Sequence, residues 1–226
     1  MVLLKDVTVT FQNGVTALDD VSLTVSDGEF AFIVGESGAG KSTLIRLLIN
    51  EIPPTSGRVY VNGFELSKLK KSRAHKLRRS IGYVFQDFKL IDSMTVYENV
   101  AFVLRCTDAT TRTIRNRVPD AISLVGLKDK VKCLPRELSG GEQQRVAFAR
   151  AIVANPKLII ADEPTGNLDP KTSLEIIELL KGLNEKCNTT VIMVTHEHEF
   201  VRAFGGRTVT LRDGKVVFDG FLNPSL

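Results

Sequence analysis

A glycine-rich segment between an apolar run and a helical pattern constrains the fold of this chain more than any other feature. Residues 35–42 have the sequence Gly-Glu-Ser-Gly-Ala-Gly-Lys-Ser, which fits the pattern G-x-x-x-x-G-K-S/T and follows the apolar run 30–34. A strand, a glycine loop and a helix in succession over residues 30–52 indicate a parallel sheet with crossover helices. The sequence therefore predicts an α/β core.

The same segment, called the phosphate loop below, predicts a site for a nucleoside triphosphate. Its glycines let backbone N–H groups and the N-terminus of the next helix approach phosphate oxygens. Lys41 would reach the β- and γ-phosphates, Ser42 would coordinate Mg²⁺, and Thr43 would begin the helix body. A plain glycine turn would match by chance in roughly one chain in a hundred. A dinucleotide loop fails because Lys41 follows Gly40 where G-x-G-x-x-G spacing is required. The residues expected around the phosphates are Gly35, Glu36, Ser37, Gly38, Ala39, Gly40, Lys41, Ser42 and Thr43.

Hydrophobic patterning divides the chain into a β-rich part and a helical insert. Between residues 87 and 155 the β signal fades, and Val118, Ile122 and Val125 repeat at helical spacing. We expect one domain over residues 1–226, with a nucleotide-binding lobe at 1–86 and 156–226 and a helical subdomain at 87–155. The first strands would form an antiparallel flank. Strands are predicted at 3–11, 17–25, 30–34, 58–61, 81–85, 158–161, 190–195 and 207–211.

Composition excludes few functions but bears on location. The net charge of +4 is too mild to dictate an anionic partner. The three cysteines fit no zinc or C-x-x-C spacing, as is typical of a reduced cytosolic protein. Lys5 and Asp6 leave no room for a signal peptide, and no window approaches the ~18 apolar residues of a membrane span. We expect a cytoplasmic protein that reaches a membrane only through a partner.

Polar side chains follow three more of the predicted strands. Asp162 and Glu163 end the buried run 158–161, Gln86 follows the run 81–85, and His196 follows the run 190–195. The carboxyl ends of parallel strands form the ligand-binding edge of α/β sheets, so these residues and the phosphate loop should meet there. Asp162 would hold Mg²⁺, and Glu163 would polarise the attacking water. Each motif alone is weak, because solvated strand ends and structural histidines are commoner.

Residues 138–142, Leu-Ser-Gly-Gly-Glu, open a second helix and are called the signature turn below. Ser139 is a natural N-cap, and Glu142 three residues later completes a capping box. Local capping is the simpler interpretation. A helix N-terminus preceded by two glycines is also an anion site, although the chain already has one phosphate loop.

With these motifs in this order, the chain resembles the ATP-binding-cassette (ABC) ATPases over its whole length. The resemblance implies a P-loop NTPase fold with a RecA-like parallel-sheet core, and ATP and Mg²⁺ as ligands. It also implies an ATP-bound homodimer in which the signature turn, through Ser139, Gly140, Gly141 and Glu142, completes the site of the opposite subunit.

The resemblance further implies catalytic roles for Lys41, Gln86, Glu163 and His196, with Gln86 also contacting the metal. Phe11 would stack on adenine, although it could simply be a core residue. The segment Asn167-Leu168-Asp169 would cross the dimer seam and place Asp169 near the nucleotide. Departures from the family pattern are small: Glu36 stands where proline is common, and Glu142 replaces the usual glutamine.

Residues 162–170 resemble the ABC subgroup that serves cell-division, lipoprotein-release and macrolide-type complexes. Within it, residues 84–91 and 95–101 are most similar to the bacterial cell-division ATPases, which pair with an integral membrane protein. The chain would then lie on the inner face of the plasma membrane. Phe88, Leu90 and Ile91 are the candidate docking residues, unless they pack internally. The basic run 68–79 could touch anionic lipid, but a solvated helix face is the commoner outcome.

Other functions are less well supported by the sequence. An exporter of the lipoprotein-release or macrolide type is the alternative within the subgroup. A soluble ABC ATPase of DNA repair or translation would carry long coiled coils or two cassettes, whereas this chain has one cassette and no sustained heptads. No nucleic-acid binding is therefore expected. An inactive cassette is disfavoured because Lys41 and Glu163 are both present.

Overall fold

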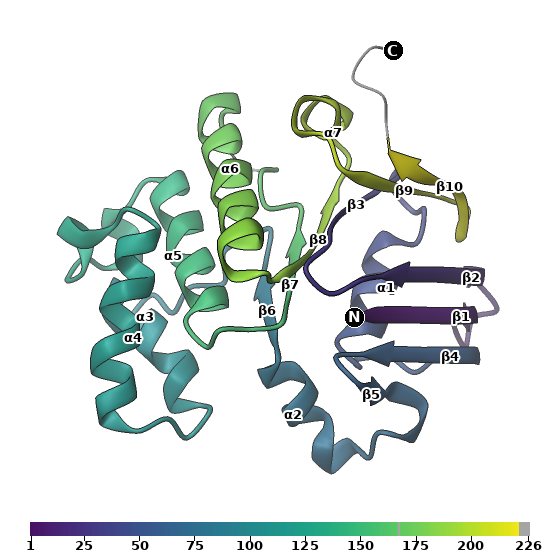
Figure 1. Cartoon of the computed structure of the whole chain (residues 1–226), viewed down its shortest axis with the longest axis horizontal. Helices are drawn as coiled ribbons and strands as arrows, with labels where there is room; N and C mark the ends of the chain where they lie inside the picture. Colours follow the sequence, from purple (N-terminus) through teal and green to yellow (C-terminus); the bar gives the residue numbers. More distant parts are fainter. Residues whose placement is uncertain (167, 222–226) are drawn as a thin grey trace.

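The structure, a computed structural model, describes residues 1–166 and 168–221 and contains two β-sheets (Figure 1). The smaller sheet has the order β2-β1-β4-β5 and is antiparallel. It matches the predicted N-terminal flank. Its strands are β1 (Val2–Thr10), β2 (Thr16–Val25), β4 (Ser56–Val61) and β5 (Phe64–Glu65).

The larger sheet has the order β10-β9-β3-β8-β7-β6, and all of its neighbouring pairs are parallel except β10 with β9. This is the predicted parallel core. Its strands are β3 (Phe30–Val34), β6 (Ile81–Val84), β7 (Leu158–Asp162), β8 (Thr190–Thr195), β9 (Arg207–Arg212) and β10 (Lys215–Phe221).

The helices cover both faces of the larger sheet. In Figure 1, α3, α4 and α5 gather on the left, the smaller sheet lies on the right, and β7 and β8 run between them. The helices are α1 (Lys41–Leu48), α2 (Ala74–Arg79), α3 (Val96–Arg105), α4 (Thr111–Leu124), α5 (Gly140–Ile152), α6 (Pro170–Cys187) and α7 (His198–Phe204). Short 3₁₀ turns occur at Leu66–Lys68, Lys71–Arg73, Lys128–Lys130 and Pro135–Glu137.

Side-chain alternation along β3 divides the interior into two cores. Phe32 and Val34 face the core that the sheet shares with α3 to α6, whereas Ala31 and Ile33 face the core that it shares with α1 and the smaller sheet. A strand buried on both faces is apolar at every position, which explains the continuous run of β3. Helix α1, which carries the end of the phosphate loop, is therefore enclosed between two sheets.

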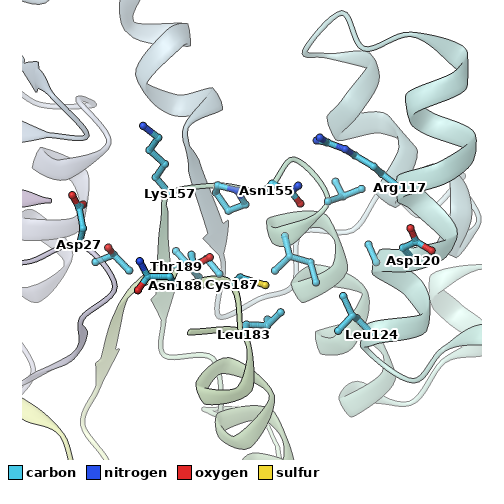
Figure 2. A pocket seen from close by; sticks show the side chains of 16 residues that line it. Asp27, Arg117, Asp120, Leu124, Asn155, Lys157, Leu183, Cys187, Asn188 and Thr189 are labelled. Atoms are coloured by element: carbon cyan, nitrogen blue, oxygen red, sulfur yellow. The ribbon is translucent and has the colours of Figure 1, made fainter. Parts of the chain in front are cut away.

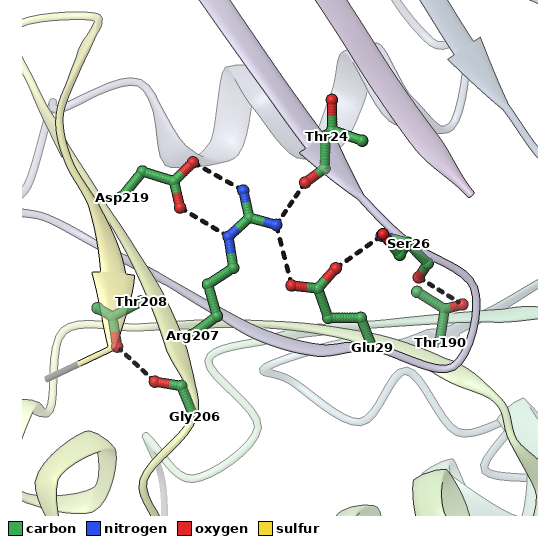
Figure 3. Close-up of polar contacts among 8 residues, drawn as sticks. All are labelled: Thr24, Ser26, Glu29, Thr190, Gly206, Arg207, Thr208 and Asp219. Carbon is green, nitrogen blue, oxygen red and sulfur yellow. Dashed lines mark hydrogen bonds and ion pairs between the residues drawn. The ribbon is translucent and has the colours of Figure 1, made fainter.

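Arg207 on β9 ties the two sheets together (Figure 3). Its guanidinium donates two hydrogen bonds to the Asp219 carboxylate on β10, at 2.6 and 2.7 Å, and one to Glu29 Oε1 at 2.9 Å. It also donates one to the backbone oxygen of Thr24 on β2, at 2.5 Å. A single side chain thus joins β9, β10, β2 and the turn before β3.

The structure differs from the predicted elements mainly at their ends. Strands β5 and β10 were not predicted, and the other strand bounds differ by at most two residues. Helix α1 begins at Lys41, with Gly40 as its N-cap, so Thr43 does not start it as expected. Cys106, Cys133 and Cys187 are free thiols. Within the described residues, no helix is both long and apolar enough to cross a bilayer.

Candidate functional site

The predicted site residues come together at one edge of the larger sheet. Val34 on β3 pairs with Thr195 on β8, and Asp162 at the end of β7 pairs with Val194. The residues that follow these strands are the phosphate loop, His196 and Glu163. Parallel pairing in register therefore places them at the same sheet edge, as the sequence predicts.

A cavity of ≈ 490 Å³ lies against the phosphate loop. Ser37, Gly38, Gly40, Lys41, Ser42 and Thr43 line it from one side, and Ala17, Glu163 and His196 complete it. The Lys41 ammonium is buried and donates to the backbone oxygens of Gly35, at 2.6 Å, and Glu36, at 2.9 Å. The lysine is thus held over the loop, where its charge favours phosphate oxygens.

The backbone at position 40 requires a glycine. Its φ is 106°, and a Cβ at this position would lie 2.5 Å from the backbone oxygen of Ala17. A β-carbon would therefore meet both backbone strain and a steric clash with the β1–β2 hairpin.

Glu163 and His196 form a pair on the cavity wall. His196 Nδ1 lies 3.2 Å from Glu163 Oε1, and the Glu163 side chain is about one fifth exposed. Glu163 adopts φ of 43°, a left-handed conformation that is uncommon for residues other than glycine, and its N–H donates to Val194 O at 2.9 Å. Glu163 thus lines the same cavity as the phosphate loop, where a base for an attacking water is expected.

Asp162 is partly buried beside Glu163 and has a partner that the sequence analysis did not single out. The Tyr83 hydroxyl on β6 donates to Asp162 Oδ2 at 3.1 Å. Burial raises the pKa of Asp162, while the Tyr83 hydrogen bond and the Lys41 charge oppose that rise. Burial, reinforced by the Asp162 charge, raises the pKa of Tyr83, so its hydroxyl keeps its proton and remains a donor.

The donors around this edge fit a magnesium ion that is held mainly through phosphates. Ser42, Asp162 and Gln86 supply oxygen atoms, and Mg²⁺ is usually bound by one or two protein oxygens together with water and substrate phosphates. No group of three or more His, Cys, Asp or Glu side chains among the described residues could hold a metal alone. Gln86 is exposed, and a Cβ on Gly166 would lie 3.2 Å from its Nε2 atom, so its amide borders the segment after Glu163.

The signature turn lies outside this cavity. Ser139 caps α5: its Oγ accepts from Glu142 N at 3.3 Å, and Glu142 Oε2 accepts from Ser139 N at 2.8 Å. The Ser139 N–H, together with Lys130 at 3.3 Å from the carboxylate, lowers the pKa of Glu142. The capping box is confirmed, while Ser139 and Gly140 are exposed and none of residues 139–142 lines the cavity.

None of the remaining predicted residues that the structure describes lines the cavity. Phe11 is half-buried where the β1–β2 hairpin begins, and only Ala17 of that hairpin reaches the cavity. Asp169 caps α6 by accepting from Thr172, whose hydroxyl lowers the pKa of the carboxylate. Asn167 lies outside the described residues. Phe88 and Leu90 pack against the core beneath α3 to α6, and Ile91 is half-buried, so internal packing accounts for part of this segment.

Gln144 is a connecting residue that the sequence analysis missed. It is fully buried on α5, and its Nε2 atom donates to Pro164 O at 2.7 Å, just after Glu163. It follows the signature turn by two residues. Its hydrogen bond therefore links the helix that this turn opens to the segment that follows Asp162 and Glu163. Its spacing in the sequence gives no signal of this contact.

A second cavity, of ≈ 740 Å³ and so larger than the one at the phosphate loop, lies at the opposite ends of β7 and β8 (Figure 2). Arg117, Asp120 and Leu124 of α4 line one side, and Leu183 and Cys187 of α6 line another. It contains none of the predicted site residues. Size alone would therefore have pointed away from the phosphate loop.

Comparison with known proteins agrees with this geometry. A family model described as ABC transporter matches residues 18–166. The cell division ATP-binding protein FtsE of Streptococcus pneumoniae is 51% identical over 216 residues, covering 96% of this chain and 94% of that protein. FtsE of Bacillus subtilis is 47% identical, covering 97% and 96%. The methionine import ATP-binding protein MetN of Carboxydothermus hydrogenoformans is 43% identical, covering 99% and 68%.

Solved structures of ABC cassettes are also similar to this chain. The ATP-binding cassette MJ0796, in a dimeric post-hydrolysis state bound to ADP and Pi, superposes with a TM-score of 0.88 at 40% identity and covers 99% of both chains. The cassette cbiO1 of Clostridium perfringens superposes with a TM-score of 0.91 at 31% identity, covering 99% of this chain and 88% of that one. The chain therefore belongs to the ABC transporter family, as an ATP-binding and ATP-hydrolysing cassette.

Proposed function

We propose that two copies of this chain close head to tail and hydrolyse ATP at sites to which both contribute. One copy would supply the phosphate loop, Glu163 and His196, and the other would supply the signature turn. The observation that carries this proposal is the separation of the two anion-binding segments: the cavity gathers the first, while Ser139 and Gly140 lie exposed outside it. The dimeric state of the solved MJ0796 cassette supports the same arrangement.

Each proposed role follows from the chemistry of its side chain. Lys41 and the loop N–H groups of residues 35–43 bind the phosphates, and Ser139 to Glu142 of the second copy face the γ-phosphate. Glu163 accepts a proton from the attacking water, and His196 orients the Glu163 carboxylate through the 3.2 Å contact. Phe11 provides a platform for adenine, and Asp169 contributes from the segment at the dimer seam.

Magnesium completes the proposed site. Ser42, Gln86 and Asp162 would hold it. The ion would neutralise the charge on the phosphate oxygens when bound.

We further propose that the motion of this dimer acts on an integral membrane protein in cell division, an FtsX-like partner. The FtsE proteins at 47–51% identity over nearly the whole chain support this role over that of MetN, of which the chain covers 68%. In this role the chain lies on the cytoplasmic side, peripheral to the inner face of the plasma membrane. Lipoprotein-release and macrolide-type export remain the alternatives within the subgroup.

We place the docking surface beside Phe88, Leu90 and Ile91. A cavity of ≈ 540 Å³ opens between α2, α3, β6 and α5, and the exposed ring of Phe102 lines it. Arg150, which also lines it, donates to Lys89 O at 2.6 Å, so the cavity borders the segment that carries these residues. A cytoplasmic segment of the partner bound there would contact both the residues that follow Gln86 and the helical insert at 87–155.

Glu163→Gln tests the catalytic proposal. Losing the base while keeping the shape should lower turnover about 10²–10³-fold, or ~3–4 kcal/mol in the barrier. ATP should still bind, and the dimer should accumulate, because hydrolysis no longer opens it. Single-turnover quench-flow and size-exclusion chromatography with ATP measure both effects, and Lys41→Ala, which should instead weaken ATP binding itself, is the contrast. Near-wild-type turnover by Glu163→Gln would remove Glu163 from the mechanism.

A further inference from the structure

Tyr83 occupies a position that the proposed mechanism does not use. It lies on β6, where it pairs with Ile160 of the neighbouring strand β7. Side chains alternate along a strand, so Ile160 and Asp162 lie on one face of the sheet and Ala161 on the other. Ile160 belongs to the core that encloses α1, and Tyr83 packs against the same core. Strand pairing therefore places Tyr83 and Asp162 on the face that carries the phosphate-loop helix.

The half-buried ring of Tyr83 has two apolar neighbours that restrict where its hydroxyl can point. The ring packs against the α1 core and lies 4.3 Å, centroid to centroid, from the ring of Phe85. The hydroxyl reaches Asp162 Oδ2 at 3.1 Å. This bond engages Oδ2 and leaves Oδ1 for another ligand.

We propose that Tyr83 is a positioning residue for the metal-binding carboxylate: its hydroxyl orients Asp162 so that Oδ1 faces the magnesium site. This inference rests on the proposed role of Asp162. Hydrogen-bond partners behind a metal-binding carboxylate fix its orientation and hence its affinity for the ion. Tyr83 does not line the phosphate-loop cavity, so in this role it acts through Asp162.

Tyr83→Phe tests the proposal, because it removes the hydroxyl and leaves the ring. The readout is Mn²⁺ binding to the ADP complex of the full chain, measured by electron paramagnetic resonance, with ADP affinity in EDTA measured separately. We expect Mn²⁺ affinity to fall about tenfold, as for other partners of metal ligands, while metal-free ADP affinity and the unfolding temperature stay unchanged. Tyr97→Phe, a half-buried tyrosine on α3 without contact to Asp162, is the matched control.

Asp162→Asn separates failure of this inference from failure of the proposed function. If Asp162→Asn loses Mn²⁺ but Tyr83→Phe binds it like wild type, the positioning role is wrong and Asp162 keeps its proposed role. If Tyr83→Phe weakens metal-free ADP binding as much as Mn²⁺ binding, the hydroxyl serves general packing and the inference also fails. If Asp162→Asn binds Mn²⁺ normally, the assignment of Asp162 to the metal is itself wrong.

Discussion

Replacing Arg207 with methionine should destabilise the chain far more than its surface location suggests. The Arg207 side chain is 18% exposed, and the carboxylates of Glu29 and Asp219 are 22% and 34% exposed. Methionine keeps the apolar stem but removes four hydrogen bonds, and it leaves two partly buried carboxylates without their cation. The substitution therefore removes hydrogen bonds and also leaves negative charge without a compensating cation.

The expected magnitude lies between those for exposed and buried ion pairs. Exposed pairs contribute less than ~1 kcal/mol, whereas removing one partner of a buried pair costs about 3–5 kcal/mol. For partners that are one fifth to one third exposed, we expect about 2–3 kcal/mol of unfolding free energy. In a domain of this size that corresponds to a decrease in Tm of about 4–12 °C.

Urea unfolding followed by circular dichroism, with a parallel thermal scan, measures this effect. Arg212→Met is the matched control, since Arg212 ends the same strand, is exposed and forms no ion pair with any residue of 1–166 or 168–221. Arg207→Lys should recover only part of the loss, because an ammonium cannot bond both oxygens of Asp219 in parallel. Equal midpoints for Arg207→Met and Arg212→Met would refute the reasoning.

Two further predictions concern the phosphate loop and the signature turn. Gly40→Ala should lower the free energy of unfolding in urea by at least ~1 kcal/mol more than Gly38→Ala does. Both glycines have positive φ, but only a Cβ at Gly40 would clash with backbone atoms. Equal losses would show that the structure relieves this clash. Glu142→Gln should be less stable than wild type only above acidic pH. The folded-state pKa of Glu142 is depressed, so its contribution is complete above the unfolded value of about 4.3 and is lost as pH falls through the folded value. A stability difference that persists unchanged to pH 2 would contradict this.

The sequence predicted which residues meet at one edge of the larger sheet because its signals are local. A strand, a loop and a helix in succession define where the phosphate loop lies, and parallel strands bring their carboxyl ends together whatever their order. The contact between Tyr83 and Asp162 instead depends on β6 lying next to β7, across a separation of 79 residues. Strand order is set by packing of the whole sheet, so no local pattern reveals that neighbour.

Strand β10 was missed although the sequence contains a signal for it. Asp213 and Gly214 both have positive φ and join β9 to β10 as a two-residue hairpin turn, for which Asp-Gly is a preferred sequence. The residues of the strand do not show the regular alternation that would have predicted it. An irregularity between Val216 and Phe218 interrupts the alternation, and both Phe218 and Phe221 are exposed. Asn62 and Gly63 form the equivalent turn before the short strand β5.

The division of the interior at β3 has a mechanical consequence. Neighbouring side chains of one strand serve two separate cores, so α1 is enclosed by sheets on both sides, whereas α3, α4 and α5 pack against one another and against one face of the larger sheet. Helices packed on a single face can slide or tilt without opening the core around α1. A shift of the helices that carry the signature turn would therefore leave the second core, which holds the phosphate-loop helix, closed.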